Sequence, residues 1–286
     1  MTQLARLAQR LFNVPLALHP GKAEVVMAAL GERFGVSHLL SAGRPVALMP
    51  ADLEDDDRSD YRPYDIVAGV AVIPVDGTLV QKLGSVRPWS GMTGYDGIRI
   101  CFLDALADKD VKAIVLDVDS PGGEVAGCFD LVDTIYSARG AKPIHAILNE
   151  NAYSAAYAIA SAADRVVVPR TGGTGSIGVV CLHADLSQAM SKAGITVTLV
   201  RSDPEKFEGN QYEPLGKDTL ARLQAEIDTS GDLFKATVAR NRGVPVSKVQ
   251  ATKAGTFQGA AGIEAGLADD VMAPDAAFRA LLDQID

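Results

Sequence analysis

Short apolar segments rich in β-branched residues alternate with helical segments from residue 66 onward, and this alternation constrains the fold more than any other feature. Strands are expected at 66–75, 111–118, 143–148, 165–169 and 195–200. Helices are expected at 94–107, 124–138, 153–163, 184–193, 216–242 and 260–266. Strands that are separated by helices pair in parallel, so the pattern predicts an α/β fold with much parallel sheet.

The chain divides into three predicted parts. Residues 1–60 look like an N-terminal extension with a helix from about residue 20 and an acidic linker at 52–60. Residues 61–272 carry the regular alternation and form the predicted compact domain, and residues 273–286 form a C-terminal tail. With 286 residues, 48% of them hydrophobic, the chain can bury a sizeable core.

Composition argues against several functional classes. The net charge of −9 makes nucleic acid a poor partner, since phosphate contacts need clustered Lys and Arg. The chain has only three cysteines, an odd number, which argues against a disulfide framework. This cysteine content fits a reducing compartment. No run of about 18 apolar residues occurs, and the N-terminus lacks a signal-peptide pattern. We therefore expect a cytoplasmic protein that does not contact the membrane.

Two segments can supply the parts of one catalytic site. The strand at 113–118 runs into Ser-Pro-Gly-Gly, where Gly122 and Gly123 can expose backbone N–H groups to an oxyanion. Ser154 stands at the start of an alanine-rich helix, where a hydroxyl can act as a nucleophile. A lone serine is more often a small packing residue, and the upstream Gly-Gly turn is what favours the catalytic interpretation.

A serine nucleophile needs a base, and the sequence leaves histidine and lysine open. His183 follows Ser154 by 29 residues and is one candidate. His19 and His38 lie in the extension, and His145 lies in an expected core strand. Histidine is therefore a minority candidate as the base.

The other candidate base is Lys206, in the aperiodic segment 201–215. A lysine base needs its pKa lowered from about 10.4 to roughly 7–8 by burial. Asp203 and Glu205 lie beside it and oppose that change. A solvated surface lysine is the ordinary alternative.

Two other patterns suggest binding sites. Gly173, Gly175 and Gly178 match the spacing of a dinucleotide fingerprint after a strand, but the following residues 179–182 read as a strand rather than a helix start. Cys181 and His183 are two potential ligands without a second pair, so they do not indicate a zinc site. We expect no cofactor and no metal.

The ordered combination of segments resembles the signal peptide peptidase family of serine proteases, peptidase family S49, over residues 67–271. Within that family it is most similar to the tailed-phage branch of prohead, or capsid-maturation, proteases. Each segment alone is weak, and the order in which they occur makes the resemblance specific. The segments are Asp119-Ser120-Pro121-Gly122-Gly123, Tyr153-Ser154-Ala155-Ala156-Tyr157, Thr174-Gly175-Ser176-Ile177-Gly178-Val179 and Lys206 with Gly209-Asn210 and Tyr212-Glu213-Pro214-Leu215.

The resemblance implies a Clp protease/crotonase-like fold of repeated β-β-α units, here with an N-terminal helical extension. It assigns Ser154 as nucleophile, Lys206 as general base, Gly122 and Gly123 as the oxyanion turn, and Ser176 as a hydrogen-bonding support for the lysine. Two departures are modest. Residues 155–156 are Ala-Ala, as in the phage branch, where many members have Gly-Gly, and residue 211 is Gln where many have Pro.

The implied activity is that of a serine endopeptidase that cleaves extended protein segments, such as phage scaffold or capsid precursors. Implied partners are a protein or peptide substrate, further copies of the chain, and phage scaffold, portal or capsid proteins. The implied location is the host cytoplasm or the interior of the prohead. Two alternatives stay open: a catalytically silent oligomeric assembly module of the same fold, and a dinucleotide-binding enzyme that uses Gly173, Gly175 and Gly178.

A closed homo-oligomer is also expected. The segment 201–215 has too little regular structure to bury Lys206 by itself, so a neighbouring subunit could complete the site. The helix at 216–242 carries an apolar stripe longer than one sheet layer needs. We expect that stripe to face inward at Leu220, Leu223, Ile227, Phe234 and Val238.

Overall fold

The computed structural model describes residues 14–19, 62–83 and 91–285. A mostly parallel sheet forms its centre, and the main strand order is β10-β7-β6-β5-β3-β2. The three longest strands, each well covered on both faces along most of its length, are β3 (Val70–Val80), β5 (Ala113–Glu124) and β6 (Ile144–Tyr153). The α/β prediction with a parallel sheet is confirmed. The shorter edge strands are β7 (Arg165–Val168), β10 (Asp270–Val271) and the antiparallel β2 (Asp65–Val67).

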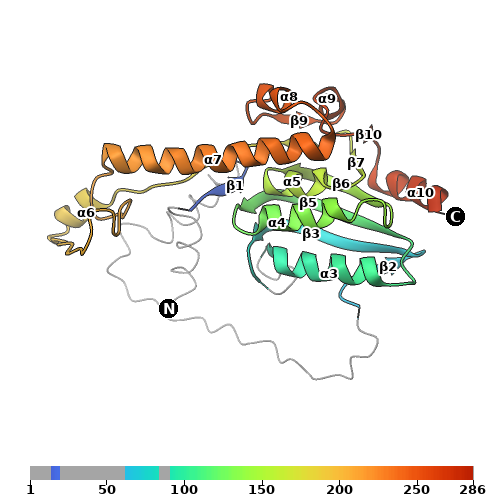
Figure 1. Cartoon of the computed structure of the whole chain (residues 1–286), viewed down its shortest axis with the longest axis horizontal. Coiled ribbons are helices and arrows are strands. Elements are labelled where there is room, and N and C mark those ends of the chain that lie inside the picture. Colours follow the sequence, from blue (N-terminus) through green and yellow to red (C-terminus); the bar gives the residue numbers. More distant parts are fainter. Residues whose placement is uncertain (1–13, 20–61, 84–90, 286) are drawn as a thin grey trace, which may run out of the picture.

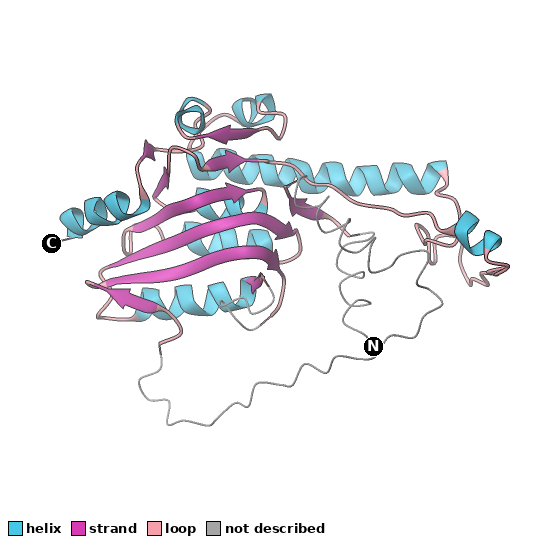
Figure 2. Cartoon of the chain, turned by 180° about the vertical axis from the view of Figure 1, so that it is seen from behind, coloured by secondary structure: helices cyan, strands magenta, loops and turns pink. Residues whose placement is uncertain are grey.

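Three helices cover one face of this sheet, and a fourth packs on the other (Figure 1). The first three are α3 (Tyr95–Ala107), α4 (Cys128–Ser137) and α5 (Ala155–Ser161). On the opposite face, α10 (Pro274–Ile285) buries Ala277 and Leu281 against the sheet, and Figure 2 shows this side. The predicted C-terminal tail is therefore mainly a packed helix.

Smaller elements surround the carboxyl ends of the central strands. Strand β8 (Gly173–Gly175) extends β6 in parallel, and β9 (Thr256–Gln258) pairs with β8. Strand β4 (Met92–Gly94) pairs with the end of β3. Strand β1 (Leu16–Leu18) pairs antiparallel with the end of β5. The two short helices α8 (Val246–Ala251) and α9 (Ala260–Glu264) flank β9.

The long helix α7 (Lys217–Arg242) is only half covered. Its buried residues all lie between Gly231 and Asn241, and its N-terminal half projects beyond the sheet (Figures 1 and 2). The predicted inward stripe is thus correct for Phe234 and Val238 and wrong for Leu220, which is 53% exposed. Leu223 and Ile227 are half-buried. The stripe stays open because few of the described elements pack against this half.

The segment at 195–200 was predicted as a strand from its β-branched alternation, and this prediction is wrong. Residues 195–200 form no strand, and Val200 is 95% exposed. Strand formation requires a partner ladder, and none of the described strands lies beside this segment. The helix α6 (Ser187–Lys192), which precedes it, is shorter than the predicted 184–193.

Much of the predicted extension lies outside the described residues, including the expected helix from residue 20 and the acidic linker. Residues 16–18 are described, and they join the sheet as β1. Among the described helices, none is long and apolar enough to cross a membrane.

Candidate active site

The Gly-Gly turn forms the last part of β5, not a loop after it. Gly122 has φ +101°, a conformation that favours glycine, and Gly123 packs against the β3 backbone. A Cβ at Gly123 would lie 1.8 Å from the carbonyl oxygen of Leu79. Both glycines are therefore required by the close approach of neighbouring chain segments.

Ser154 joins β6 to α5 in an unusual backbone conformation. Its φ of 56° and ψ of −123° lie in a region that side chains rarely adopt. Two hydrogen bonds hold this conformation: the Ser154 N–H donates to the Gly175 carbonyl at 2.9 Å, and the Ser154 carbonyl accepts from the Ala158 N–H at 2.9 Å.

The hydroxyl of Ser154 is buried and has no hydrogen-bond partner among the described residues. A buried polar group without a partner is unusual, because leaving it unsatisfied costs about 1–3 kcal/mol. Such an exception is found where a group is reserved for a ligand or a reaction. The unpartnered hydroxyl of Ser154 is compatible with the role of nucleophile that the sequence predicts.

Gly122 and Ser154 are in contact. A Cβ built on Gly122 would lie 2.9 Å from the Cβ of Ser154. The N–H of Gly122 is already engaged, since it donates to Ser120 Oγ at 3.1 Å, and Ser120 donates to the Gly77 carbonyl at 2.6 Å. Of the two glycines predicted for the oxyanion turn, the geometry favours Gly123 as the N–H donor.

Ser176 lies next to this pair. Gly175 accepts the Ser154 N–H, and Ser176 follows it with φ 55° and a buried side chain. The Ser176 N–H donates to the Gly255 carbonyl at 2.8 Å, which fixes the turn. The structure thus brings together four predicted site residues: Gly122, Gly123, Ser154 and Ser176.

Lys206, the fifth predicted site residue, does not lie beside the other four within one chain. Its side chain is exposed, in the segment between α6 and α7. That segment lies at the far end of α7 from the sheet, whereas Ser154 begins the buried helix α5 (Figures 1 and 2). Any contact between Lys206 and a Ser154 hydroxyl would have to come from another copy of the chain or from a rearrangement.

The histidines are placed differently. His145 is at the start of β6 and Ser154 follows its end, so the two are about 30 Å apart along an extended strand. Burial lowers the pKa of His145, as expected of a neutral core histidine. His183 is half-buried, three residues after Val180, which pairs with β1. His183 stays the alternative base.

The glycine-rich segment does not have the geometry of a dinucleotide site. Gly173 and Gly175 lie in β8, where they allow close packing against the Tyr153 hydroxyl and the Gly255 carbonyl. No helix follows before Ser187, so no helix N-terminus faces the glycines. The described residues also contain no cluster of three or more potential metal ligands of the His, Cys, Asp and Glu types.

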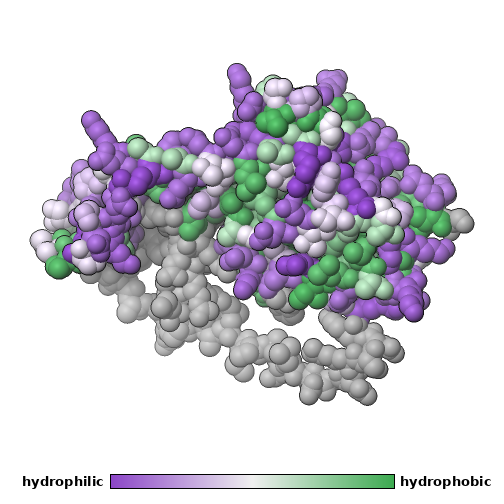
Figure 3. Space-filling view, in the orientation of Figure 1, coloured by the Kyte–Doolittle hydropathy of each residue, from purple (hydrophilic) through white to green (hydrophobic). Residues whose placement is uncertain are grey.

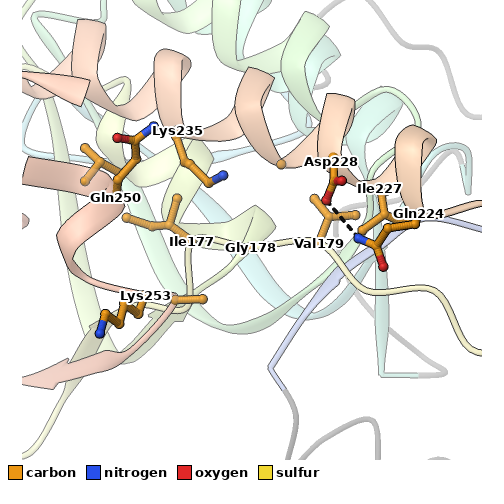
Figure 4. A pocket seen from close by; sticks show the side chains of 12 residues that line it. Ile177, Gly178, Val179, Gln224, Ile227, Asp228, Lys235, Gln250 and Lys253 are labelled. Atoms are coloured by element: carbon orange, nitrogen blue, oxygen red, sulfur yellow. Dashed lines mark hydrogen bonds between the residues drawn. The ribbon is translucent and has the colours of Figure 1, made fainter. Parts of the chain in front are cut away.

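A cavity of about 360 Å³ lies on the α7 side of this region (Figure 4). Ile177 and Val179 line one wall, and Gln224, Asp228 and Lys235 of α7 line another. The Gln224 side chain donates to Asp228 at 2.8 Å across the helix surface. Ser154 is not in the lining, so the cavity lies beside the turn at Ser176 without including Ser154.

The amino-acid sequence matches a known protein family and several known proteins. The model of the family described as Peptidase family S49 matches residues 137–285, more than half of the chain. The head-tail preconnector protein GP5 of Enterobacteria phage P21 is 42% identical over 276 residues, which cover 94% of this chain and 55% of that protein. Capsid assembly protease C of Escherichia phage lambda is 37% identical over 294 residues, 100% of this chain and 67% of that protein.

More distant relatives extend the comparison. Protease 4 of Haemophilus influenzae is 28% identical over 220 residues, 75% of this chain and 34% of that protein. A solved structure of a putative enoyl-CoA hydratase/isomerase (crotonase) from Legionella pneumophila matches with a TM-score of 0.47 and 14% identity, over 78% of this chain and 73% of that one. The chain spans 55% and 67% of the lengths of the two phage relatives.

Proposed function

The chain belongs to peptidase family S49, and from that premise we propose that it is a serine endopeptidase with Ser154 as nucleophile and Lys206 as general base. The observation that carries this proposal is the Ser154 hydroxyl itself. The hydroxyl is buried and has no hydrogen-bond partner among the described residues. The backbone of Ser154 is strained, and the residue contacts a glycine turn that offers a backbone N–H.

In the proposed reaction Ser154 Oγ attacks the scissile carbonyl and transfers its proton to the lysine amine. The Gly123 N–H stabilises the oxyanion, and the lysine returns the proton to the leaving amine. Water then hydrolyses the acyl-enzyme by the same route. The role proposed for Ser176 is to position the lysine, and its place next to Gly175, whose carbonyl accepts the Ser154 N–H, supports this.

We propose that Lys206 reaches Ser154 from a neighbouring copy of the chain. Its exposed position at the far end of α7 supports this, as does the uncovered apolar surface of that arm. The named phage relatives support a substrate among proteins of capsid assembly, cleaved in extended segments. A site completed between subunits would admit such segments and exclude folded proteins.

The test is labelling with a fluorophosphonate followed by peptide mass spectrometry, together with casein or peptide hydrolysis. We expect the label on Ser154, and we expect Ser154→Ala to lose several orders of magnitude in rate with its fold retained. Ser161→Ala, a buried serine of the same helix, is the matched control and should keep its activity. Turnover by Ser154→Ala near that of the unmodified protein would contradict the assignment, and an unlabelled, inactive protein would indicate an assembly module instead.

A further inference from the structure

Strand β1 is held on both of its edges beside the proposed nucleophile. On one edge it pairs antiparallel with β5, with Ala17 opposite Gly123 and Leu18 opposite Gly122. On the other edge, Leu16 and Val180 exchange two backbone hydrogen bonds of 2.8 and 2.9 Å. All three residues of β1 are buried.

The register places one carbonyl of β1 at the catalytic groups. The His19 N–H donates to the Pro121 carbonyl at 2.8 Å, and the Val125 N–H donates to the Pro15 carbonyl at 3.3 Å. Hydrogen-bonded pairs alternate along an antiparallel ladder, so Ala17 and Gly123 form the hydrogen-bonded pair between these two bonds. The Gly123 N–H, the favoured oxyanion donor, is thereby directed at the Ala17 carbonyl.

The same carbonyl is close to Ser154. A Cβ built on Gly122 would meet the Ala17 carbonyl oxygen at 2.3 Å and the Ser154 Cβ at 2.9 Å. The Ala17–Leu18 peptide therefore lies against the nucleophile, on the oxyanion side. His19, the next residue after β1, stacks on Tyr153 with ring centroids 4.8 Å apart, which also holds the chain against the end of β6, next to Ser154.

The edge that β1 occupies is one that an extended peptide can use. Strand β6 pairs with β5 as far as Ser120 opposite Ala152 and then leaves it, so the last residues of β5 have an edge open to another strand. Peptides bind such an edge by adding a strand, with backbone bonds giving affinity and alternate side chains giving selectivity. Here the edge ends beside a nucleophile.

We propose that residues 15–19 occupy the substrate cleft as a built-in peptide, with Ala17 in the place of the substrate residue whose carbonyl Ser154 attacks. This inference rests on the proposed function. A substrate must displace β1 and take the same antiparallel register, with a small side chain at the position of Ala17. Because the cleft is self-occupied, the apparent affinity for substrate is reduced by the fraction of chains in which β1 has left.

A reversible disulfide tests this in the full chain. Leu16 and Glu124 are opposite each other in a non-hydrogen-bonded pair, where Cα atoms are about 4.5 Å apart, within disulfide range. The variant Leu16→Cys/Glu124→Cys is made in a Cys181→Ser background, because Cys181 is the half-buried native thiol, and Cys101 and Cys128 are buried. Oxidation should lower peptide hydrolysis at least about tenfold, and reduction should restore it.

The single variants Leu16→Cys and Glu124→Cys are the matched controls, and their rates should be the same before and after oxidation. The Glu124→Cys variant also measures the effect of losing the hydrogen bond that the Glu124 carboxylate accepts from the Gln81 N–H, without a disulfide. If the disulfide forms and the oxidised enzyme is as active as the reduced one, the inference is overturned. Failure of the disulfide to form in the folded protein would overturn it as well, because the strands would not be paired.

A second variant keeps the test independent of the disulfide. Leu16→Pro removes the N–H that donates to the Val180 carbonyl and should free the cleft, lowering KM for a peptide substrate while kcat changes little. Leu16→Val keeps the N–H and should leave KM unchanged. An unchanged KM in Leu16→Pro would overturn the inference. If the Cys181→Ser parent neither hydrolyses peptide nor takes the fluorophosphonate on Ser154, the proposed function fails instead.

Discussion

At the scale of single residues, Ser154 combines backbone strain with burial. A non-glycine residue at φ 56° and ψ −123° raises the free energy of the folded state by about 1–3 kcal/mol. The Gly175 carbonyl and the first turn of α5 enforce this conformation. The strain is local to Ser154, and backbone strain of this kind is common at residues that are held in place for a function.

Removing the strain should stabilise the protein. We expect Ser154→Gly and Ser154→Ala both to be inactive, with Ser154→Gly the more stable by about 1 kcal/mol, or about 2–4 °C in Tm. Differential scanning calorimetry measures this difference. The same pair of changes at Ser191, exposed in α6, should give the opposite order, because glycine weakens an ordinary helix. Equal or lower stability of Ser154→Gly would contradict the strain argument.

Asp117 gives the chain a predicted dependence of stability on pH. Burial, and then the charges of Asp76 and Asp119, raises its pKa to about 6. A carboxyl whose pKa is higher in the folded state binds its proton more tightly there, so its ionisation destabilises the fold increasingly as the pH rises from about 4 to about 6.

Asp117→Asn should therefore raise the Tm at pH 8, by about 2–4 °C for about 1 kcal/mol after solvent screening. At pH 4 the gain should largely vanish, because the carboxyl is then protonated in the folded protein. Asn149 donates to Asp117 Oδ1, and an asparagine oxygen can accept the same bond. Asp104→Asn, an exposed aspartate on α3, is the control. A larger gain at pH 4 than at pH 8 would reverse the sign of the argument.

At the scale of elements, α5 depends on a residue distant in the sequence. All seven of its residues are buried, so the carbonyls at its C-terminal end cannot reach water. Arg139 donates to the carbonyls of Ser161, Ala162 and Ala163, and a further bond to the Asn241 carbonyl at 3.0 Å ties α7 to the same group. This guanidinium caps the helix that Ser154 begins.

Arg139→Ala should destabilise the protein by about 2–4 kcal/mol, because several buried carbonyls lose their partners at about 1–3 kcal/mol each. Urea unfolding measures the change as a lower midpoint with an unchanged slope. Arg279→Ala removes an exposed pair with Asp275 on α10 and should cost less than about 0.5 kcal/mol. Comparable losses in the two variants would show that Arg139 does not act as a cap.

The sequence predicted the elements that its periodicity marks and missed those that depend on distant partners. Hydrophobic pattern located β3, β5, β6, α3 and α7 within a few residues. It ended β5 and β6 too early, because glycine and polar residues at their ends pair only through tertiary contacts. Strand β1 has three residues, too few for a period, and the cap at Arg139 has no local signal.

The site was predictable to the same extent. Ser154, Gly122 and Gly123 were identified from the sequence and Ser176 from the family resemblance, and the structure brings the four together. Their catalytic roles stay predictions. The engagement of the Gly122 N–H by Ser120 was not predicted, because it depends on the Gly77 carbonyl across the sheet.

At the scale of the whole molecule, the end that carries α6 exposes apolar surface that a monomer would be expected to cover. Ile195, Val200, Phe207 and Leu220 are exposed on and around the arm formed by α6 and the N-terminal half of α7. A second exposed apolar patch lies over α3, where Ile100 and Leu103 face solvent (Figure 3). Several exposed apolar residues in one region of a protein often mark a protein–protein interface.

Oligomerisation and activity should therefore be coupled. We expect light scattering to show a closed homo-oligomer, and specific activity to fall on dilution as subunits separate. Val200→Asp and Leu220→Glu should shift the mass towards the monomer and lower activity in parallel. Asp275→Lys, at an exposed position of α10 at the opposite end of the molecule (Figure 1), is the control for altered surface charge. A monomer with constant specific activity down to nanomolar concentration would contradict this expectation.

Mixing two inactive variants separates a lysine supplied by the neighbouring subunit from one supplied by the same chain. Ser154→Ala and Lys206→Ala should each be inactive, whereas His183→Ala should stay active. The first two variants are dissociated, mixed in equal amounts and reassembled. If the lysine acts between subunits of a closed ring, about a quarter of the sites in the mixture pair an intact Ser154 with an intact Lys206. Activity should therefore return to about a quarter of that of the unmodified protein. If both residues must come from one chain, no mixed interface contains a working pair and the mixture stays inactive. Recovery of activity in the mixture therefore decides whether the lysine comes from the same subunit as the serine or from its neighbour. An active Lys206→Ala variant would instead assign the role of general base to His183.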